Sequence, residues 1–262
     1  MRLVGTASSG IRAQQVAIDT IGNNLANVNT SGFKANQMNF AEALSTEVRF
    51  GNGSAGGNVG VTTVAVGSGV LYNSSEMNLQ QGDLAQTGRP LDLGINGDGF
   101  FQVKTFDGKT GYTRAGTFQV DGSGQLTDMQ GNIVQPSVVI PSGARELAVA
   151  SNGEITGVVA GIKTVFGQIS LAGFQNPLGL ERIGNNLFVP SVNSGIPQVG
   201  QPGTTLGDQV LGTIRGQSLE QSNVDLAASM AELIQVQRAY QMNARLVSDG
   251  DKMWGIANTI RR

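Results

Sequence analysis

The sequence predicts an α+β protein in which long N- and C-terminal helices pair as a coiled-coil-like domain, with a central antiparallel β-rich domain. Apolar residues recur at steps of three and four near both chain ends, whereas the middle alternates apolar and polar residues between short turns. The expected division is a terminal helical domain of residues 1–34 with 218–262, a connecting segment 35–90 with a glycine-rich loop, and a β-rich domain 91–217.

The first predicted helix spans residues 3–28 and presents one apolar stripe. The stripe consists of Val4, Ala7, Ile11, Gln14, Ile18, Ile21, Leu25 and Val28, of which only Gln14 is polar. This spacing is typical of a coiled-coil seam, so the helix needs a partner helix or another copy of the protein. Asn and Gly residues that favour a helix end follow in Asn27-Val-Asn-Thr-Ser-Gly-Phe-Lys34.

The connecting segment contains a glycine-rich loop at residues 51–60. Gly51, Gly53 and Gly56 match the G-x-G-x-x-G pattern of a dinucleotide-binding turn, which must be followed by a helix. Residues 61–66 are rich in β-branched side chains and favour a strand there instead. The pattern therefore favours a flexible loop or an edge hairpin, and we expect no cofactor.

The middle of the chain reads as an antiparallel meander, a small barrel or a sandwich. Residues 91–95 and 101–106 alternate apolar and polar side chains, as half-buried strands do. The turn pairs that separate such runs are Asn96-Gly97, Asp98-Gly99, Asp107-Gly108, Asp121-Gly122 and Asn152-Gly153. Asn-Gly and Asp-Gly between alternating runs are the strongest short-range hairpin signal. The turn at residues 96–101 lacks the closing Glu of a calcium loop, so we expect no metal site.

The second predicted helix begins near Ser222-Asn223, which are good N-cap residues, and continues toward Ile260. Its stripe consists of Leu226, Met230, Leu233, Gln237, Tyr240, Ala244 and Val247. Taken singly, each helix could be an ordinary core element covering the β-rich domain. Taken together, the matched stripes favour pairing of the two chain ends or assembly of several copies.

Composition argues against several functional classes. The 262 residues include neither Cys nor His, which removes the thiol nucleophile, the commonest metal ligand and the commonest general base. We therefore expect no enzyme, although a pair of convergent carboxylates stays open. The net charge of −2 provides no basic field for nucleic acid. No apolar stretch approaches 18 residues, and residues 1–10 lack a secretory signal pattern, so we expect neither a membrane span nor a cleavable signal peptide.

Four blocks, in the same order along the chain, resemble the bacterial flagellar rod and hook family. They are Asn23-Asn-Leu-Ala-Asn-Val-Asn-Thr-Ser-Gly-Phe-Lys34, Asn96-Gly-Asp-Gly-Phe-Phe-Gln-Val103, Tyr112-Thr-Arg-Ala-Gly-Thr-Phe118 and Gln235-Val-Gln-Arg-Ala-Tyr-Gln-Met-Asn243. The family-motif residues that we single out are Asn24, Leu25, Ala26, Asn27, Asn29, Thr30, Gly32, Phe33 and Lys34. The length suits a rod subunit with one β-rich domain, because hook proteins usually carry an extra outer domain.

The resemblance implies a structural subunit that polymerises into a helical tube and transmits motor torque to the hook. The self-assembly residues would then be Val4, Ala7, Ile11, Ile18, Ile21, Leu25, Val28, Leu226, Met230, Leu233, Tyr240 and Val247. Implied partners are further copies of the chain, proximal rod and hook or hook-junction subunits, the rod cap and the export apparatus. In a two-membrane bacterium the P and L rings are added. The implied location is the flagellar basal body in the cell envelope and periplasm, reached by type III export without a cleaved signal.

Two alternatives stay open at this point. Within the same family, the chain could be a proximal rod or hook subunit. In another class, a secreted β-rich adhesin or carbohydrate-binding module would explain the hairpins, but not the matched helical stripes at both ends.

Overall fold

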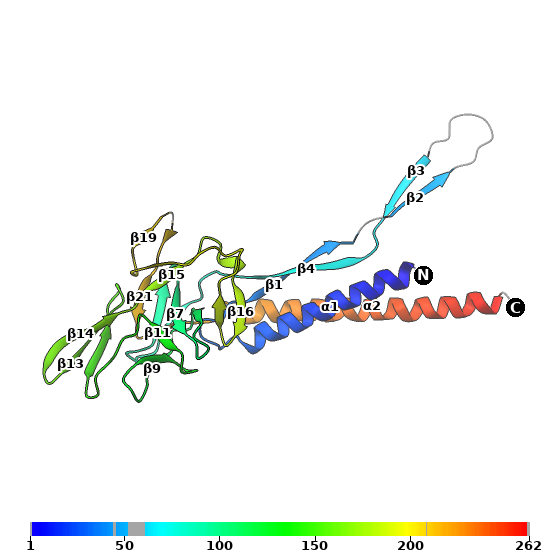
Figure 1. Ribbon diagram of the computed structural model, residues 1–262. Helices are drawn as coiled ribbons and strands as arrows, with labels where there is room; N and C mark the ends of the chain where they lie inside the picture. Colours follow the sequence, from blue (N-terminus) through cyan, green and yellow to red (C-terminus); the bar gives the residue numbers. More distant parts are fainter. Residues whose placement is uncertain (1, 44–45, 52–60, 208, 261–262) are drawn as a thin grey trace. The chain divides into compact units, whose positions relative to one another are not determined.

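The computed structural model describes residues 2–43, 46–51, 61–207 and 209–260, and its chain divides into two compact units. The helical unit comprises Met1–Ala26, Asn36–Glu76 and Asp225–Arg262, and the β unit comprises Asn27–Ala35 and Met77–Val224. Within the described residues the chain has two α-helices, one near each end (Figure 1). The predicted α+β class with a β-rich centre agrees with this composition. Neither helix is apolar over a length that could cross a membrane, as far as its residues are described.

The helical unit combines the two helices with paired strands. Its elements are α1 (Arg2–Ala26), β1 (Asn36–Glu42), β2 (Thr46–Gly51), β3 (Val61–Val66), β4 (Val70–Met77) and α2 (Leu226–Ile260). Strand β1 pairs with β4, and β2 forms an antiparallel hairpin with β3. Most of the predicted glycine-rich loop, residues 52–60, lies outside the described residues, so the choice between cofactor turn and plain loop is not addressed by the structure.

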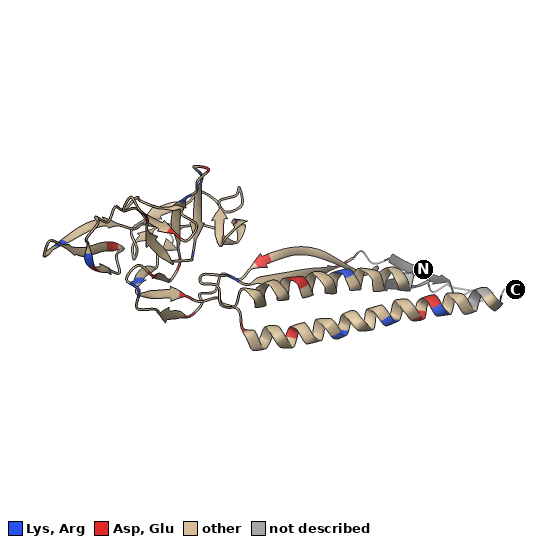
Figure 2. Ribbon diagram, turned by 90° about the horizontal axis from the view of Figure 1, so that it is seen from below, with Lys and Arg blue, Asp and Glu red and all other residues tan. Residues whose placement is uncertain are grey.

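The predicted coiled-coil pairing of the terminal helices is wrong. Helices α1 and α2 lie side by side (Figures 1 and 2), but only Leu233 and Val247 of the predicted α2 seam are half-buried. Leu226, Met230 and Tyr240 of that seam are exposed. The side chains of α2 that are at least half-buried include Ser229, Leu233, Val236, Ala239, Asn243, Val247 and Gly250. Ser229, Ala239, Asn243 and Gly250 in this row are too small or too polar to supply the large interlocking side chains that a coiled coil requires.

Close approach of the two backbones explains this choice of residues. A Cβ atom added to Gly10 would lie 2.8 Å from the side-chain nitrogen of Asn243, and one added to Gly250 would lie 3.3 Å from Val4. Larger side chains at either glycine would push the helices apart. Contacts through small residues let helices pack closely without knobs that enter holes.

Helix α1 has a second buried face that its predicted stripe does not include. Ala13, Ala17 and Asn24 are buried although they lie off the stripe. Asn24 donates from Nδ2 to the Asn36 carbonyl (2.8 Å) and accepts from the Asn36 backbone N–H (2.9 Å), and Thr20 contacts Met38 of β1. With residues 100° apart, these positions share one face. Helix α1 therefore packs on β1 as well as on α2.

The N-terminus of α2 is capped by Asp225, slightly later than the Ser222-Asn223 pair that the sequence suggested. Asp225 Oδ1 accepts hydrogen bonds from the backbone N–H groups of Ala227 (2.8 Å) and Ala228 (3.1 Å). A carboxylate at this position satisfies two unpaired donors and is favoured by the helix dipole. Asn223, the predicted cap, has a different role that is described below.

The β unit is a series of short antiparallel strands. Its elements are β5 (Leu84–Gln86), β6 (Leu93–Asn96), β7 (Phe100–Lys104), β8 (Thr110–Thr113), β9 (Phe118–Val120), β10 (Leu126–Asp128), β11 (Ile133–Gln135), β12 (Arg145–Val149), β13 (Glu154–Val159), β14 (Ile162–Gln168), β15 (Leu171–Gly173), a 3₁₀ turn (Pro177–Gly179), β16 (Glu181–Gly184), β17 (Leu187–Val189), β18 (Gln198–Gly200), β19 (Thr205–Leu206), β20 (Gln209–Val210), β21 (Thr213–Gly216) and β22 (Ser218–Glu220).

Strand β7 is the centre of the largest sheet. The described strands of this sheet run in the order β16-β17-β8-β7-β11-β10-β9, and β15 pairs with both β7 and β18. Phe101 of β7 lies opposite Thr113 of β8, and Val103 lies opposite Val134 of β11. The strands of this sheet pair antiparallel, as predicted, but their order is not that of a simple meander, because β17 lies beside β8 and β11 beside β7. Strands β12, β13 and β14 form a separate three-stranded sheet.

Two apolar clusters lie on the two faces of β7, because successive side chains of a strand point to opposite sides. Phe101 and Val103 belong to the larger cluster. Phe100 belongs to a second cluster with Met77, Tyr112, Ala172, Phe174, Leu180 and Phe188. The Phe100 ring meets those of Phe174 and Phe188 edge to face at 5.7 and 5.8 Å between ring centres. Such pairs stabilise a core beyond simple burial.

The beginning and the end of the β unit pair with each other. Strand β6 pairs with β21, placing Ile95 opposite Ile214, and β5 pairs with β22, placing Leu84 opposite Glu220. The unit is therefore closed by contacts between segments that are distant in sequence. The functional candidate described next lies at this closure.

Candidate functional site

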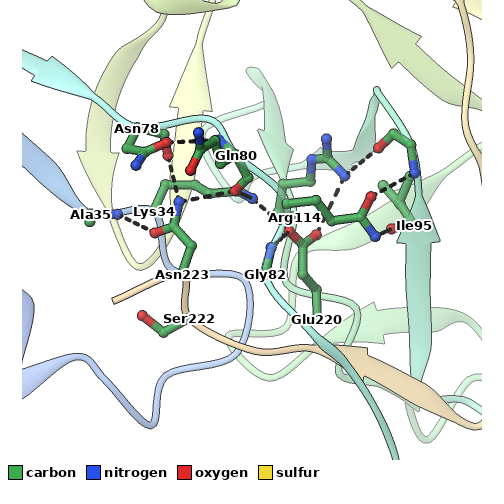
Figure 3. Close-up of polar contacts among 12 residues, drawn as sticks. Lys34, Ala35, Asn78, Gln80, Gly82, Ile95, Arg114, Glu220, Ser222 and Asn223 are labelled. Carbon is green, nitrogen blue, oxygen red and sulfur yellow. Dashed lines mark hydrogen bonds and ion pairs between the residues drawn. The ribbon is translucent and has the colours of Figure 1, made fainter. Parts of the chain in front are cut away.

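A buried ionic cluster joins three segments of the β unit. They are residues 32–35, residues 78–82 and residues 220–223. The side chains that join them are Lys34, Arg114, Glu220 and Asn223, which we call the clasp (Figure 3). The three segments belong to the β unit and are adjacent in sequence to the ends of α1, β4 and the start of α2.

Lys34 and Glu220 form the centre of the clasp. Lys34 Nζ donates to Glu220 Oε1 at 2.6 Å and to the Gln80 carbonyl at 2.7 Å, and both charged side chains are fully buried. Burial lowers the pKa of Lys34, because desolvation of the ammonium outweighs the favourable effect of Glu220. An ion pair removed from water is stable only if its remaining hydrogen-bonding groups also find partners. The Gln80 carbonyl provides a second acceptor for the Lys34 ammonium.

Arg114 provides a second cation for the same carboxylate. Its Nη1 donates to the Gly97 carbonyl at 2.9 Å and lies 3.4 Å from Glu220 Oε2. Burial lowers the pKa of Arg114 as well, but a guanidinium stays charged in proteins. The backbone N–H of Gly82 donates to Glu220 Oε1 at 3.1 Å. Glu220 thus accepts hydrogen bonds from two cations and one backbone amide.

Asn223 bonds to two other segments through its single side-chain amide. Its Oδ1 accepts from the Ala35 N–H at 2.8 Å, and its Nδ2 donates to the carbonyls of Asn78 (2.8 Å) and Gln80 (3.0 Å). Both donors and the acceptor of the amide are therefore used. A carboxylate at this position could not donate, so asparagine is required.

The segment that follows α1 is held by further contacts. The Gly32 N–H donates to the Glu220 carbonyl at 2.8 Å, and Asn186 Nδ2 donates to the Ser31 carbonyl at 3.2 Å. The Arg182 guanidinium lies 5.3 Å from the Phe33 ring centre and donates to the Lys34 carbonyl. Gly32 has φ +69°, and a Cβ there would lie 2.6 Å from the Ala115 nitrogen, so only glycine fits.

The family-motif residues divide between the two units. Gly32, Phe33 and Lys34 are buried at the clasp, whereas Asn24 is buried against β1. Asn27 and Thr30 make a turn in which the Thr30 N–H donates to the Asn27 carbonyl at 3.1 Å. The remaining motif residues are half-buried Leu25 and exposed Ala26 and Asn29.

The predicted self-assembly residues differ in exposure. Ala7 and Ile21 are buried within the chain itself. Those that are half-buried are Val4, Ile11, Ile18, Leu25, Val28, Leu233 and Val247. Leu226, Met230 and Tyr240 are exposed. No contact between copies is present to test this set, so the interface stays a prediction.

Sequence reasoning missed Glu220 and the role of Arg114. Glu220 pairs with Lys34, which is 186 residues away in the sequence, and no pattern among neighbouring residues predicts a contact between such distant positions. Arg114 lies in a quoted motif, but its burial depends on the sheet that encloses it. One signal for this contact was available in the sequence. Charged residues are scarce in this chain, so a Lys directly after Gly-Phe suggests that the Lys has an acidic partner.

The chemistry of the clasp is that of a structural joint. Its charges are directed at one another and at backbone groups, which fixes geometry rather than preparing a reaction. Over the part of the chain that the structure describes, no group of three or more acidic side chains gathers to hold a metal ion. The fold and the clasp together define a class of structural protein. In this class a closed β unit holds, by buried polar contacts, the segments that are adjacent in sequence to two terminal helices.

Comparison with known families agrees with this class. Residues 5–34 match "Flagella basal body rod protein", residues 94–157 match "Flagellar hook protein FlgE/F/G D1 domain", and residues 215–260 match "Flagellar basal body rod FlgEFG protein C-terminal". The matched segments contain most of α1, all of α2, and Lys34, Arg114, Glu220 and Asn223.

Whole-length relatives extend the match. The flagellar basal-body rod protein FlgG of Caulobacter vibrioides is 38% identical, with 100% of both chains covered. That of Bacillus subtilis is 36% identical, covering 97% of this chain and 96% of its own. The flagellar hook-basal body complex protein FlhP of Bacillus subtilis is 30% identical over 100% of both chains. The chain therefore belongs to the family of flagellar basal-body rod proteins.

Within this family the resemblance is to the distal rod protein, which the name FlgG denotes, and the chain is a structural subunit of the rod. The rod interpretation made from the sequence is confirmed. The hook, proximal-rod, adhesin and carbohydrate-binding alternatives are not favoured by these matches. The family is one of structural proteins, and its place is the basal body of the flagellum.

Proposed function

We propose that copies of this chain assemble through their terminal helices into a helical tube, the distal rod, which transmits motor torque to the hook. Residues 1–34 with 218–262 are the assembling part, residues 91–217 are the β-rich part, and residues 35–90 connect them. Membership of the rod family supports the assembly. A property of α2 is the observation that carries it.

Helix α2 leaves many large apolar side chains exposed in the single chain. Its large apolar side chains that are 37–66% exposed are Leu226, Met230, Ile234, Tyr240, Met242, Leu246, Met253, Trp254 and Ile256. Figure 2 shows charged residues at intervals along α2, with uncharged stretches between them. Covering apolar surface stabilises an assembly by roughly 25 cal/mol per Å². Neighbouring copies of the same helices would provide that cover, and contiguous apolar surfaces of this kind mark interaction sites.

The geometry required is an open series of copies. A helical polymer uses two different surfaces of each subunit, so that contacts repeat without closing. In the proposal, Leu226, Met230 and Tyr240 meet neighbouring copies directly. The half-buried members of the predicted interface, such as Ile11 and Leu233, become fully buried when the polymer forms.

The remaining partners follow from the position of a distal rod. The tube would join proximal rod subunits at one end and hook or hook-junction subunits at the other. The rod cap and the export apparatus would deliver and place the subunits without a cleavable signal peptide, and P and L rings would surround the rod in the envelope and periplasm of a two-membrane cell. The proposal assigns the chain no catalytic role and no cofactor.

Cross-linking from α2 tests the proposal. A photo-reactive amino acid replaces Met230 in the full-length protein, and the same residue replaces Ile162 at a hairpin of the β unit as the matched control. Upon concentration, we expect tubes by electron microscopy and cross-links from position 230 to a second copy. Protein that stays monomeric at high concentration, with no cross-link from position 230, would contradict the proposal.

A further inference from the structure

A pocket of about 240 Å³ lies in the β unit where strand β7 begins. Its lining includes Gly99 and Phe100 at that end of β7, Arg114 and Asp98 as charged groups, and Phe174 and Val210. An apolar cavity of about 150 Å³ accommodates a benzene molecule. The pocket is therefore large enough for an aromatic side chain.

The walls of the pocket combine aromatic rings with an incompletely paired cation. Phe100 and Phe174 are buried and meet edge to face, and Arg114 is only 4% exposed. The recorded hydrogen bonds of Arg114 come from Nη1 (Figure 3), and no described residue offers an acceptor to its buried Nε. Lys34 and Arg114 share Glu220, and the Asp98 carboxylate also favours the charged form of both cations. Asp98 is exposed and adds a negative group to the lining.

A fitting projection exists at the opposite end of the same strand. The turn between β7 and β8 contains Phe106, which is 83% exposed, and next to it the exposed Asp107 and Lys109. The turn is ordered by the bonds of the Thr105 N–H to the Lys109 carbonyl (2.9 Å) and of the Gly108 N–H to the Thr105 carbonyl (2.9 Å). A Cβ on Gly131 would lie 3.0 Å from Phe106 Cζ, so the ring rests against the Gly131 backbone.

Strand β7 keeps the projection and the pocket of one copy apart. Phe100 lines the pocket and Phe106 follows the strand, so six residues at about 3.3 Å each separate them by roughly 20 Å. One copy cannot fill its own pocket. Two different surfaces at opposite ends of a strand are what a head-to-tail, non-closing contact uses.

We propose that the turn with Phe106 and Asp107 of one copy inserts into the pocket beside Phe100, Phe174 and Arg114 of the next copy. The Phe106 ring enters the aromatic part, Asp107 approaches the Arg114 guanidinium, and Lys109 approaches Asp98. Both charge pairs are complementary, which fixes the direction of insertion. This contact rests on the proposed copy-to-copy assembly and adds to it a second interface, between β units.

Two cysteines in a chain that has none provide the test. The double variant Asp107→Cys with Val210→Cys places one exposed thiol on the turn and one at the pocket, where Val210 is 63% exposed. We expect oxidation of assembled protein to give a ladder of dimers, trimers and longer species. Each single variant should give at most random dimers, and a mixture of the two single variants should give dimers but no ladder.

The outcomes separate this contact from the assembly itself. Cross-links from position 230 of α2 without a cysteine ladder would overturn the contact and leave the helical assembly intact. Loss of both would overturn the contact together with the proposed function. Dimers without longer species from the double variant would show a closed pair, which also contradicts a head-to-tail contact.

A second variant keeps the test valid if the cysteines disturb folding. Phe106→Ala removes an exposed ring, so we expect an unchanged melting temperature and at least a tenfold fall in the amount of assembled protein at fixed concentration. Ile162→Ala, which trims another exposed side chain of the β unit, is the matched control and should assemble normally. Normal assembly of Phe106→Ala would overturn the contact.

Discussion

The two units of this protein treat apolar side chains in opposite ways. In the β unit, residues such as Phe101, Leu126 and Ile155 are fully buried between strands. In the helical unit, α2 leaves residues such as Met230 and Trp254 more than 45% exposed. A sheet can close over two clusters, whereas two helices and thin strand pairs have too little surface to cover one another. The comparison shows that the β unit buries its large apolar side chains within itself, whereas the helical unit leaves many of those of α2 uncovered.

Charges follow the same division. The β unit buries Lys34, Arg114 and Glu220 as a paired cluster, whereas the ion pair of α2, Asp249 with Lys252, is open to water on both sides. A buried pair fixes a geometry, and an exposed one contributes little because water and salt screen it. Substitutions in the two units should therefore have very different effects on the free energy of unfolding.

The largest effect is expected from Glu220→Gln. The change keeps the shape of the side chain but leaves Lys34 and Arg114 without their shared carboxylate, which costs about 3–5 kcal/mol at a buried site. Urea unfolding of the full-length chain measures the loss. Asp249→Asn breaks the exposed pair and is the matched control, expected to change the free energy by less than about 1 kcal/mol. Equal effects of the two variants would mean that the clasp adds no specific stability.

The next largest effect is expected from Leu126→Ala in the core of the β unit. Removing a fully buried leucine side chain leaves a cavity and costs about 2–5 kcal/mol. Thermal unfolding should shift by about 2–4 °C for each kcal/mol in a unit of this size. A melting temperature within one degree of the unchanged protein would contradict the described core.

Met230→Lys should have the opposite effect to a core substitution, because it should leave stability unchanged and prevent assembly. Since Met230 is exposed, the free energy of unfolding should change by no more than about 0.5 kcal/mol. Motility should nevertheless be lost, because a charge would be buried wherever a neighbouring copy covers α2. Melting of the purified chain and swimming of cells that carry the variant are measured together. If cells with Met230→Lys swim normally and the variant has an unchanged melting temperature, this face of α2 does not belong to the assembly interface.

The smallest effect concerns the Asp121 turn, which is exposed. Hydrogen bonds from Ser123, of which Oγ–Oδ1 is 2.7 Å, and from the Gln125 N–H lower the pKa of Asp121. The folded state therefore binds this proton less tightly than the unfolded state, and its contribution to stability is lost as the pH falls through the lowered pKa of the folded state. Ser123→Ala should raise the pKa toward its ordinary value in an NMR titration. An unchanged titration midpoint would show that the hydroxyl is unimportant.

Local patterns were sufficient to predict both helices and several strands, but not how the helices pack. Period-two alternation and Asp-Gly turns are written in neighbouring residues, which is why β7, its hairpin and both helices were predictable. The stripe of α2 was misassigned because Ser229, Asn243 and Gly250 do not look like contact residues. Their contact exists only because Gly10 of α1 allows a close approach, and that is a property of two helices together.

The candidate site was predictable only in part. The segment that ends in Gly32, Phe33 and Lys34 was singled out, because helix-ending residues stand together there and because it resembles a family motif. Its partner Glu220 was not, because burial of a carboxylate becomes favourable only once Lys34 and Arg114 surround it. Asn223 was assigned to the cap of α2, a reasonable local role that Asp225 performs instead.

The clasp also dictates when the β unit can fold. Lys34 meets its partner only after 186 further residues are available, and β6 likewise waits for β21. Contacts between such distant segments form slowly, because a long loop must first be closed. When the chain is made from its N-terminus, the β unit therefore cannot close until the segment with β21 and Glu220 has been made. The closing contacts of the β unit then form late, and together.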